Sequence, residues 1–206
     1  MARCTVSHCL PVMVRRRGQT TSSERGQALV EFALALPVLL LLLFGLVEFG
    51  LAFNAAVSVN FVSRAAALLA AEGGRAEGTD CQVLRAIEQD LTSPATPTRI
   101  SRVEVYWSDA NGDQIASNVN VYTRTGSLTC TYASGSITVP YTLGTENYPE
   151  TERCDVLAGC GGLHTSVDDV GVRITYTHQW VTYVGKTIAG SITFQRSTAA
   201  RMEPTL

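Results

Sequence analysis

The chain divides into three segments by its pattern of hydrophobic and polar residues. Residues 1–26 are polar and rich in Arg, Ser and Thr, and their apolar residues show no helical or strand periodicity. An apolar segment from Leu29 to Phe53 follows, and its pattern continues at helical spacing to Glu72, before Gly73-Gly74 supplies a helix stop. We therefore predict a leader over 1–26, one long helix over 27–72 and a separate domain over 73–206.

The apolar segment has the length of a membrane span. At ~1.5 Å per residue, residues 29–53 are long enough to cross a hydrocarbon core of ~30 Å. The basic residues precede the span, so the N-terminus is expected in the cytoplasm and the C-terminal bulk outside the inner or cytoplasmic membrane. Of the two charges in the segment, Glu48 is interpreted as a solvated carboxylate that marks the outer interface.

The remaining residues predict an exported α+β domain. A short helix is expected near residues 80–91, capped by Thr79 or Asp80, and a mainly antiparallel sheet follows it. Period-two patterns predict strands around 103–107, 119–123, 137–141, 170–180 and 188–194. Asn111-Gly112 predicts a type I′ hairpin turn, Gly185-Lys186 a turn before the last strand, and residues 142–167 a long loop.

Four cysteines lie beyond the predicted span: Cys81, Cys130, Cys154 and Cys160. In an exported domain an even set predicts two disulfides, with three connectivities open. The short Cys154–Cys160 loop is the first expectation, which would leave Cys81–Cys130. A zinc site built from Cys154, Cys160 and His164 is the less favoured alternative, because structural zinc sites use a closer cysteine pair and a fourth ligand.

Charge and motifs exclude several functions. The leader carries five arginines against Glu24, whereas the rest of the chain has more acidic than basic residues, so no nucleic-acid binding is expected. No phosphate-binding, dinucleotide, Gly-x-Ser-x-Gly or His-Glu-x-x-His motif occurs. We therefore predict no enzyme activity, no catalytic residue, no metal and no cofactor. His178, on the apolar face of a strand, is interpreted as a hydrogen-bonded packing residue.

The start of the span carries a charge that needs a reason. Glu31 stands five positions after Gly26 in the run Gly26-Gln27-Ala-Leu-Val-Glu31-Phe32, and an isolated charge in an apolar span is costly. Cleavage after Gly26 would create an α-amino group on Gln27, and pairing of Glu31 with that amine on a neighbouring subunit would compensate both charges. The structurally neutral alternative is that Glu31 reaches the cytoplasmic interface of an ordinary anchor.

This run, followed by Ala-Leu-Ala-Leu-Pro37, resembles the prepilin cleavage motif of the TadE-like family of tight-adherence (Flp, type IVb) pilus assembly proteins. The closing Ser197-Thr-Ala-Ala-Arg-Met-Glu-Pro204 is also similar to the end of that family. The resemblance implies a minor pilin or pseudopilin, cut between Gly26 and Gln27 by a prepilin peptidase and partnered by the membrane and other pilin subunits. The alternatives are an uncleaved anchor presenting a ligand-binding β domain and, less favoured, an anchored hydrolase.

Overall fold

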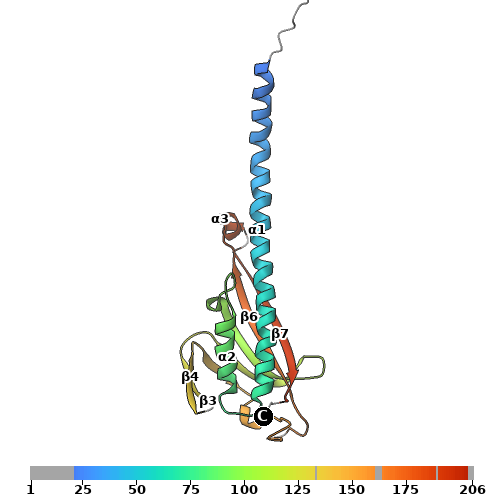
Figure 1. Cartoon of the computed structure of the whole chain (residues 1–206), viewed down its shortest axis with the longest axis vertical. Coiled ribbons are helices and arrows are strands. Elements are labelled where there is room, and N and C mark those ends of the chain that lie inside the picture. Colours follow the sequence, from blue (N-terminus) through green and yellow to red (C-terminus); the bar gives the residue numbers. More distant parts are fainter. Residues whose placement is uncertain (1–20, 133, 161–163, 189, 204–206) are drawn as a thin grey trace, which may run out of the picture. The chain divides into compact units, whose positions relative to one another are not determined.

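The computed structural model describes residues 21–132, 134–160, 164–188 and 190–203 (Figure 1). Its first element is the helix α1, Thr21–Gly73, which includes Pro37. The chain divides into two compact units, Met1–Leu43 and Phe44–Leu206, and α1 contributes residues to both. The helix therefore begins within the predicted leader, because Gly26 weakens a helix without ending it. The first twenty residues, with Cys4 and Cys9, lie outside the described part of the chain.

The second unit is built on an antiparallel sheet, so the predicted α+β class is confirmed. The sheet has the strand order β5-β2-β1-β6-β7, and β3 pairs with β4 in a separate hairpin. The strands are β1 Ile100–Ser108, β2 Gln114–Thr123, β3 Leu128–Tyr132, β4 Gly135–Val139, β5 Thr142–Glu146, β6 Asp169–Gln179 and β7 Ser191–Arg201. The helical elements after α1 are α2 Thr79–Asp90, the 3₁₀ turns Pro97–Arg99 and Glu150–Glu152, and α3 Tyr183–Ile188.

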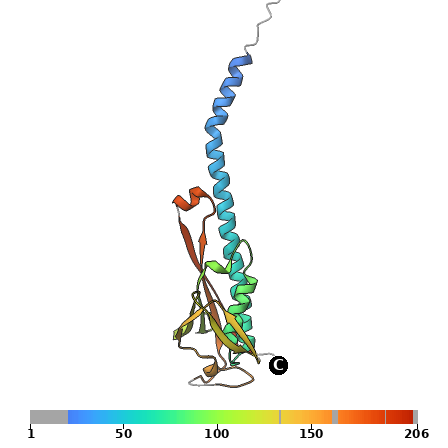
Figure 2. The same cartoon turned by 90° about the vertical axis from the view of Figure 1, so that its left-hand side faces the viewer.

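The core lies between this sheet and the helices α1 and α2, which cover one of its faces (Figure 2). From the second unit's part of α1, Ala55, Val59, Val62 and Ala66 are buried, as helical spacing predicts. Every second residue of β6 from Val170 to His178 is buried on the same side, as the period-two pattern predicts.

The opposite face of the sheet is partly covered as well. In a half-buried strand, Glu104 and Tyr106 of β1 would lie on the open face, because they alternate with Val103, Val105 and Trp107, but both are buried. The Tyr106 ring lies under the Arg173 guanidinium, whose carbon is 4.8 Å from the ring centroid. The ring also packs against Gly171, where an added Cβ would come within 2.3 Å of it. A glycine on the neighbouring strand thus makes the space in which this tyrosine packs.

Three predicted connections are wrong in detail. Residues 142–146, assigned to a loop, form β5 because their backbone pairs with β2. The Gly185-Lys186 pair lies inside α3 rather than in a turn. The β1–β2 connection is a five-residue loop in which only Gly112 has a positive φ, since the Asp109 carboxylate accepts the N–H groups of Asn111 and Asp113 and stabilises a wider turn than type I′.

Candidate functional site

The predicted processing residues lie on an exposed part of α1. Gly26, Gln27, Glu31 and Phe32 are all exposed, and no described residue comes within 4 Å of a Cβ built at Gly26. The Gln27 side chain donates a hydrogen bond from Nε2 to Glu31 Oε1, 3.0 Å away. The structure therefore places the four residues within two helical turns of α1, on its exposed surface.

A row of apolar side chains continues along α1 in the second unit. Its members, exposed by 52–73%, are Phe49, Phe53, Val57, Phe61 and Leu68. At ~100° per residue they fall in an arc roughly opposite the buried Ala55, Val59, Val62 and Ala66 of the same helix. We call this row the outer stripe. Apolar groups arranged in this way mark a surface that another apolar surface covers.

Glu48 is not the solvated boundary residue that the sequence suggested. Its side chain is buried, and it accepts hydrogen bonds from the backbone N–H groups of Val181, at 3.0 Å, and Thr182. Phe49 beside it packs edge-on against Trp180, with 5.8 Å between ring centroids. Glu48 therefore fixes the end of β6 and the start of α3 to α1. Its partners are far away in the sequence, so no local pattern could have revealed them.

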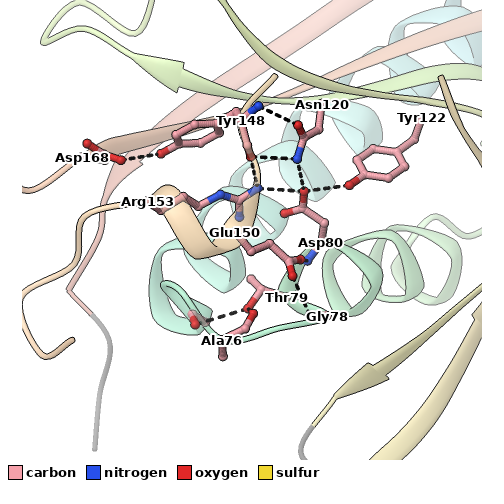
Figure 3. Close-up of polar contacts among 11 residues, drawn as sticks. Ala76, Gly78, Thr79, Asp80, Asn120, Tyr122, Tyr148, Glu150, Arg153 and Asp168 are labelled. Atoms are coloured by element: carbon pink, nitrogen blue, oxygen red, sulfur yellow. Dashed lines mark hydrogen bonds and ion pairs between the residues drawn. The ribbon is translucent and has the colours of Figure 1, made fainter. Parts of the chain in front are cut away.

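A buried ion pair connects α2 to the segment after β5 (Figure 3). Arg153 is fully buried, and its Nη2 lies 2.8 Å from Asp80 Oδ2, which also accepts hydrogen bonds from Asn120 and the Tyr122 hydroxyl. Burial by itself would raise the pKa of Asp80, but the Arg153 charge and these hydrogen bonds hold it below its usual range. Asn120 also bonds the backbone N–H and C=O of Tyr148, so one network joins three distant segments.

The start of α2 is capped from a distance. The sequence offered Thr79 or Asp80 as the cap, but the N-cap position is Gly78, and the Glu150 carboxylate accepts the N–H groups of Gly78 and Asp80, each at 2.6 Å. Gly78 has φ +81°, and a Cβ there would lie 2.2 Å from the Thr131 carbonyl oxygen. Burial, together with the nearby Asp80 charge, raises the pKa of Glu150. Thr79 instead donates to the Ala76 carbonyl at the end of the preceding turn.

Two disulfides reinforce the same region. Cys81 of α2 is bonded to Cys130 of β3, and Cys154 to Cys160, which is the pairing that the short loop favoured. Both sulfurs of the considered zinc site are therefore consumed in a disulfide. His164 contacts the buried Asp168 instead, with Nδ1 2.7 Å from the carboxylate, so the zinc interpretation is wrong.

A cavity beside this network has an acidic lining, with Glu77, Asp80, Glu146 and Glu150. Both oxygens of Glu150 are occupied by backbone N–H groups, and one oxygen of Asp80 accepts three donors while the other is buried without a partner. Neither carboxylate presents a free, accessible oxygen for proton transfer. Among the described residues, no group of three or more His, Cys, Asp or Glu side chains is arranged to hold a metal ion. The network is suited to holding the domain together.

His178 is buried as predicted, although not in the predicted manner. Neither of its ring nitrogens has a hydrogen-bond partner in the described part of the chain. It packs edge-on against Trp180, with ring centroids 5.7 Å apart. Burial lowers its pKa and the Arg99 charge lowers it further, while Glu48 acts in the opposite direction. Protonation of the buried imidazole is therefore disfavoured.

These features describe a protein with one long apolar N-terminal helix and a disulfide-bonded α+β domain. Gly26–Gly73 is long and apolar enough to cross a membrane, with a mean hydropathy of 2.6 in its most apolar part. Residues 26–68 match the family described as TadE-like protein, which confirms over this segment the resemblance drawn from Gly26, Glu31 and Phe32. The match covers about a fifth of the chain and ends within α1. Comparisons with curated proteins and with solved structures give no significant match.

Proposed function

We propose that this chain is a minor pilin or pseudopilin of a tight-adherence (type IVb) pilus, anchored by α1 and processed by a prepilin peptidase between Gly26 and Gln27. The observation that carries the proposal is the coincidence of two features on one helix. The TadE-like match runs from Gly26 to Leu68, and this segment holds both the exposed processing motif and the whole outer stripe. The protein would act as a structural subunit, without catalytic activity of its own.

The conformation of the cleavage site bears on its processing. The Gly26–Gln27 bond lies within α1, whereas a protease binds its substrate as an extended chain, so the helix must open locally there. Glycine lowers the cost of opening, because it destabilises a helix interior by about 1 kcal/mol relative to alanine. The open space around Gly26 means that an alanine would disturb no contact within the described chain.

Glu31 supplies the charge for docking in this proposal. After cleavage, Gln27 would begin the mature chain and carry its α-amino group. Glu31 is exposed among exposed apolar side chains, including Val30 and Phe32, so in lipid its charge has only local compensation from the Gln27 side chain. An amine from a neighbouring subunit would supply the missing opposite charge and define the stagger between subunits.

The outer stripe supplies the apolar contact between subunits. Phe61 and Leu68 lie about 12 Å and 22 Å beyond Phe53 along the helix axis, at ~1.5 Å per residue. They are therefore outside the predicted span and would face water in an isolated subunit. An apolar helix face of another pilin subunit would cover them in an assembly.

The decisive experiment is N-terminal sequencing of the protein recovered from membranes of cells that contain the prepilin peptidase. The proposal expects Gln27 as the first residue, whereas Met1 or Met13 would indicate the uncleaved anchor. Glu31→Ala and the isosteric Glu31→Gln should both be cleaved but poorly incorporated into a sheared pilus fraction. Normal incorporation of both variants would remove the charge-pairing part of the proposal.

A further inference from the structure

The connection from β6 to β7 carries a group of apolar and aromatic residues that the assembly proposal does not use. We call Trp180–Ile188 the tip; it contains α3 and lies at one end of the sheet beside α1 (Figures 1 and 2). Val181 is 57% exposed and Tyr183 81% exposed. A domain surrounded by water rarely gathers such side chains at one projecting end.

The tip is held at a defined position along α1. The Glu48 carboxylate binds the backbone N–H groups of Val181 and Thr182, so the tip lies at the level of Glu48 on the helix. Residues 29–48 number twenty, and about twenty apolar residues in a helix suffice to cross a hydrocarbon core. A span that begins at Leu29 therefore ends at Glu48, the residue that binds the tip.

The composition of the tip fits this depth. Tyrosine concentrates at membrane–water interfaces, where its apolar ring and polar hydroxyl are both accommodated, and Tyr183 of the tip is exposed. Lys186, the only lysine of the chain, is exposed on the tip. The sequence from Val170 to Met202 contains no Asp or Glu, and the carboxylate that does bind the tip, Glu48, is buried on the amides of Val181 and Thr182. Apolar side chains beside a lone cation complement a surface of anionic phospholipid.

We propose that the tip is a membrane-binding foot, in which Val181 and Tyr183 enter the headgroup region of the bilayer and Lys186 binds anionic lipid phosphate. The foot gives the domain a second attachment to the membrane besides α1. It therefore limits rotation of the domain about the helix axis before assembly. The inference rests on α1 crossing the bilayer but not on cleavage or on a pilus.

Depth-dependent fluorescence quenching tests the foot with the full chain reconstituted in vesicles. Trp107→Phe combined with Tyr183→Trp places a new indole on the tip. The matched control combines Trp107→Phe with Leu157→Trp, a position that is 52% exposed and lies beside Gly73, at the end of α1. Trp180 is common to both variants, so its contribution cancels in their difference. Lipids brominated near the headgroup end of the acyl chain should quench the indole at position 183 and spare that at position 157.

The lipid charge provides a second arm. Removing one cation near an anionic surface should weaken docking about fivefold, so Lys186→Gln should reduce the quenching in phosphatidylglycerol-containing vesicles and leave it unchanged in pure phosphatidylcholine. Equal quenching at positions 183 and 157 would overturn the foot. If quenching at position 183 falls as the protein-to-lipid ratio rises, because contacts between protein copies displace the lipid, the tip binds a second copy. This outcome also overturns the foot. Flotation of the unmodified chain with vesicles tests membrane insertion separately.

Discussion

Removal of the Arg153 cation is the sharpest test of the network that joins α2 to the rest of the domain. Arg153→Met keeps a long apolar side chain next to the Tyr148 ring, whose centroid lies 4.6 Å from the guanidinium carbon. It leaves the Asp80 carboxylate, which is 3% exposed, without its ion-pair partner. Breaking a buried pair from one side costs about 3–5 kcal/mol in the free energy of unfolding. For a domain of this size the melting temperature should fall by roughly 6–20 °C.

The assay is urea unfolding of the purified chain in detergent micelles, followed by tryptophan fluorescence. The control is the double variant Asp80→Asn/Arg153→Met, in which both charges are gone and the side chain at position 80 can still accept a hydrogen bond from Tyr122. It should be clearly more stable than Arg153→Met alone, because no charge is left buried without a partner. A single variant that loses less than about 1 kcal/mol, or a double variant no better than the single one, would refute the reasoning.

The pH dependence of unfolding tests the same ion pair, because the direction of the change with pH can be predicted. In the native chain the pKa of Asp80 lies below its usual range, so its contribution to stability is present above the unfolded pKa of about 3.9 and is lost as pH falls through the folded pKa. Without Arg153, burial is less opposed and the pKa of Asp80 should rise. The native and Arg153→Met unfolding free energies should therefore approach one another on acidification towards pH ~4.

Four further outcomes are expected. Gly26→Ala should slow prepilin cleavage, measured as the ratio of precursor to mature chain, while thermal unfolding stays unchanged. Phe61→Glu should reduce recovery in the sheared pilus fraction without loss of folding, since Phe61 is 70% exposed, and Phe61→Leu should be tolerated. Glu48→Ala should cost about 1–3 kcal/mol and speed hydrogen exchange at the Val181 amide. Because the pKa of His178 is lowered, native stability should fall as pH drops below the unfolded value of about 6.5, and His178→Leu should flatten that slope.

The sequence predicts the parts of this fold that repeat along the chain. The apolar period of α1 and the alternation of β6 each have one dominant buried face, so spacing alone identifies the element and its inward side. Gly73-Gly74 at the end of α1 is readable for the same local reason. The α+β class follows from the change of period after the first two helices.

The parts that escaped prediction depend on partners distant in the sequence. The segment that forms β5 has no strong alternation and is a strand because β2 offers it a backbone edge. Glu150 caps a helix that begins some seventy residues earlier, and Glu48 binds amides more than a hundred residues later. A carboxylate of this kind looks like any surface acid in the sequence, because its function is defined only by the approach of backbone N–H groups in three dimensions.

The order of the strands has a consequence for export. The buried face of α1 in the second unit meets the last elements of the chain: Ser63 is within 3.1 Å of the Thr198 hydroxyl on β7, and Glu48 binds the residues after β6. If the chain crosses the membrane from its N-terminus onward, α1 arrives first and the strands that cover it arrive last. During translocation its alanine and valine face stays open to other apolar chains. A chaperone on the far side of the membrane, or a subunit already inserted nearby, would meet this face before the protein's own β7 can close over it.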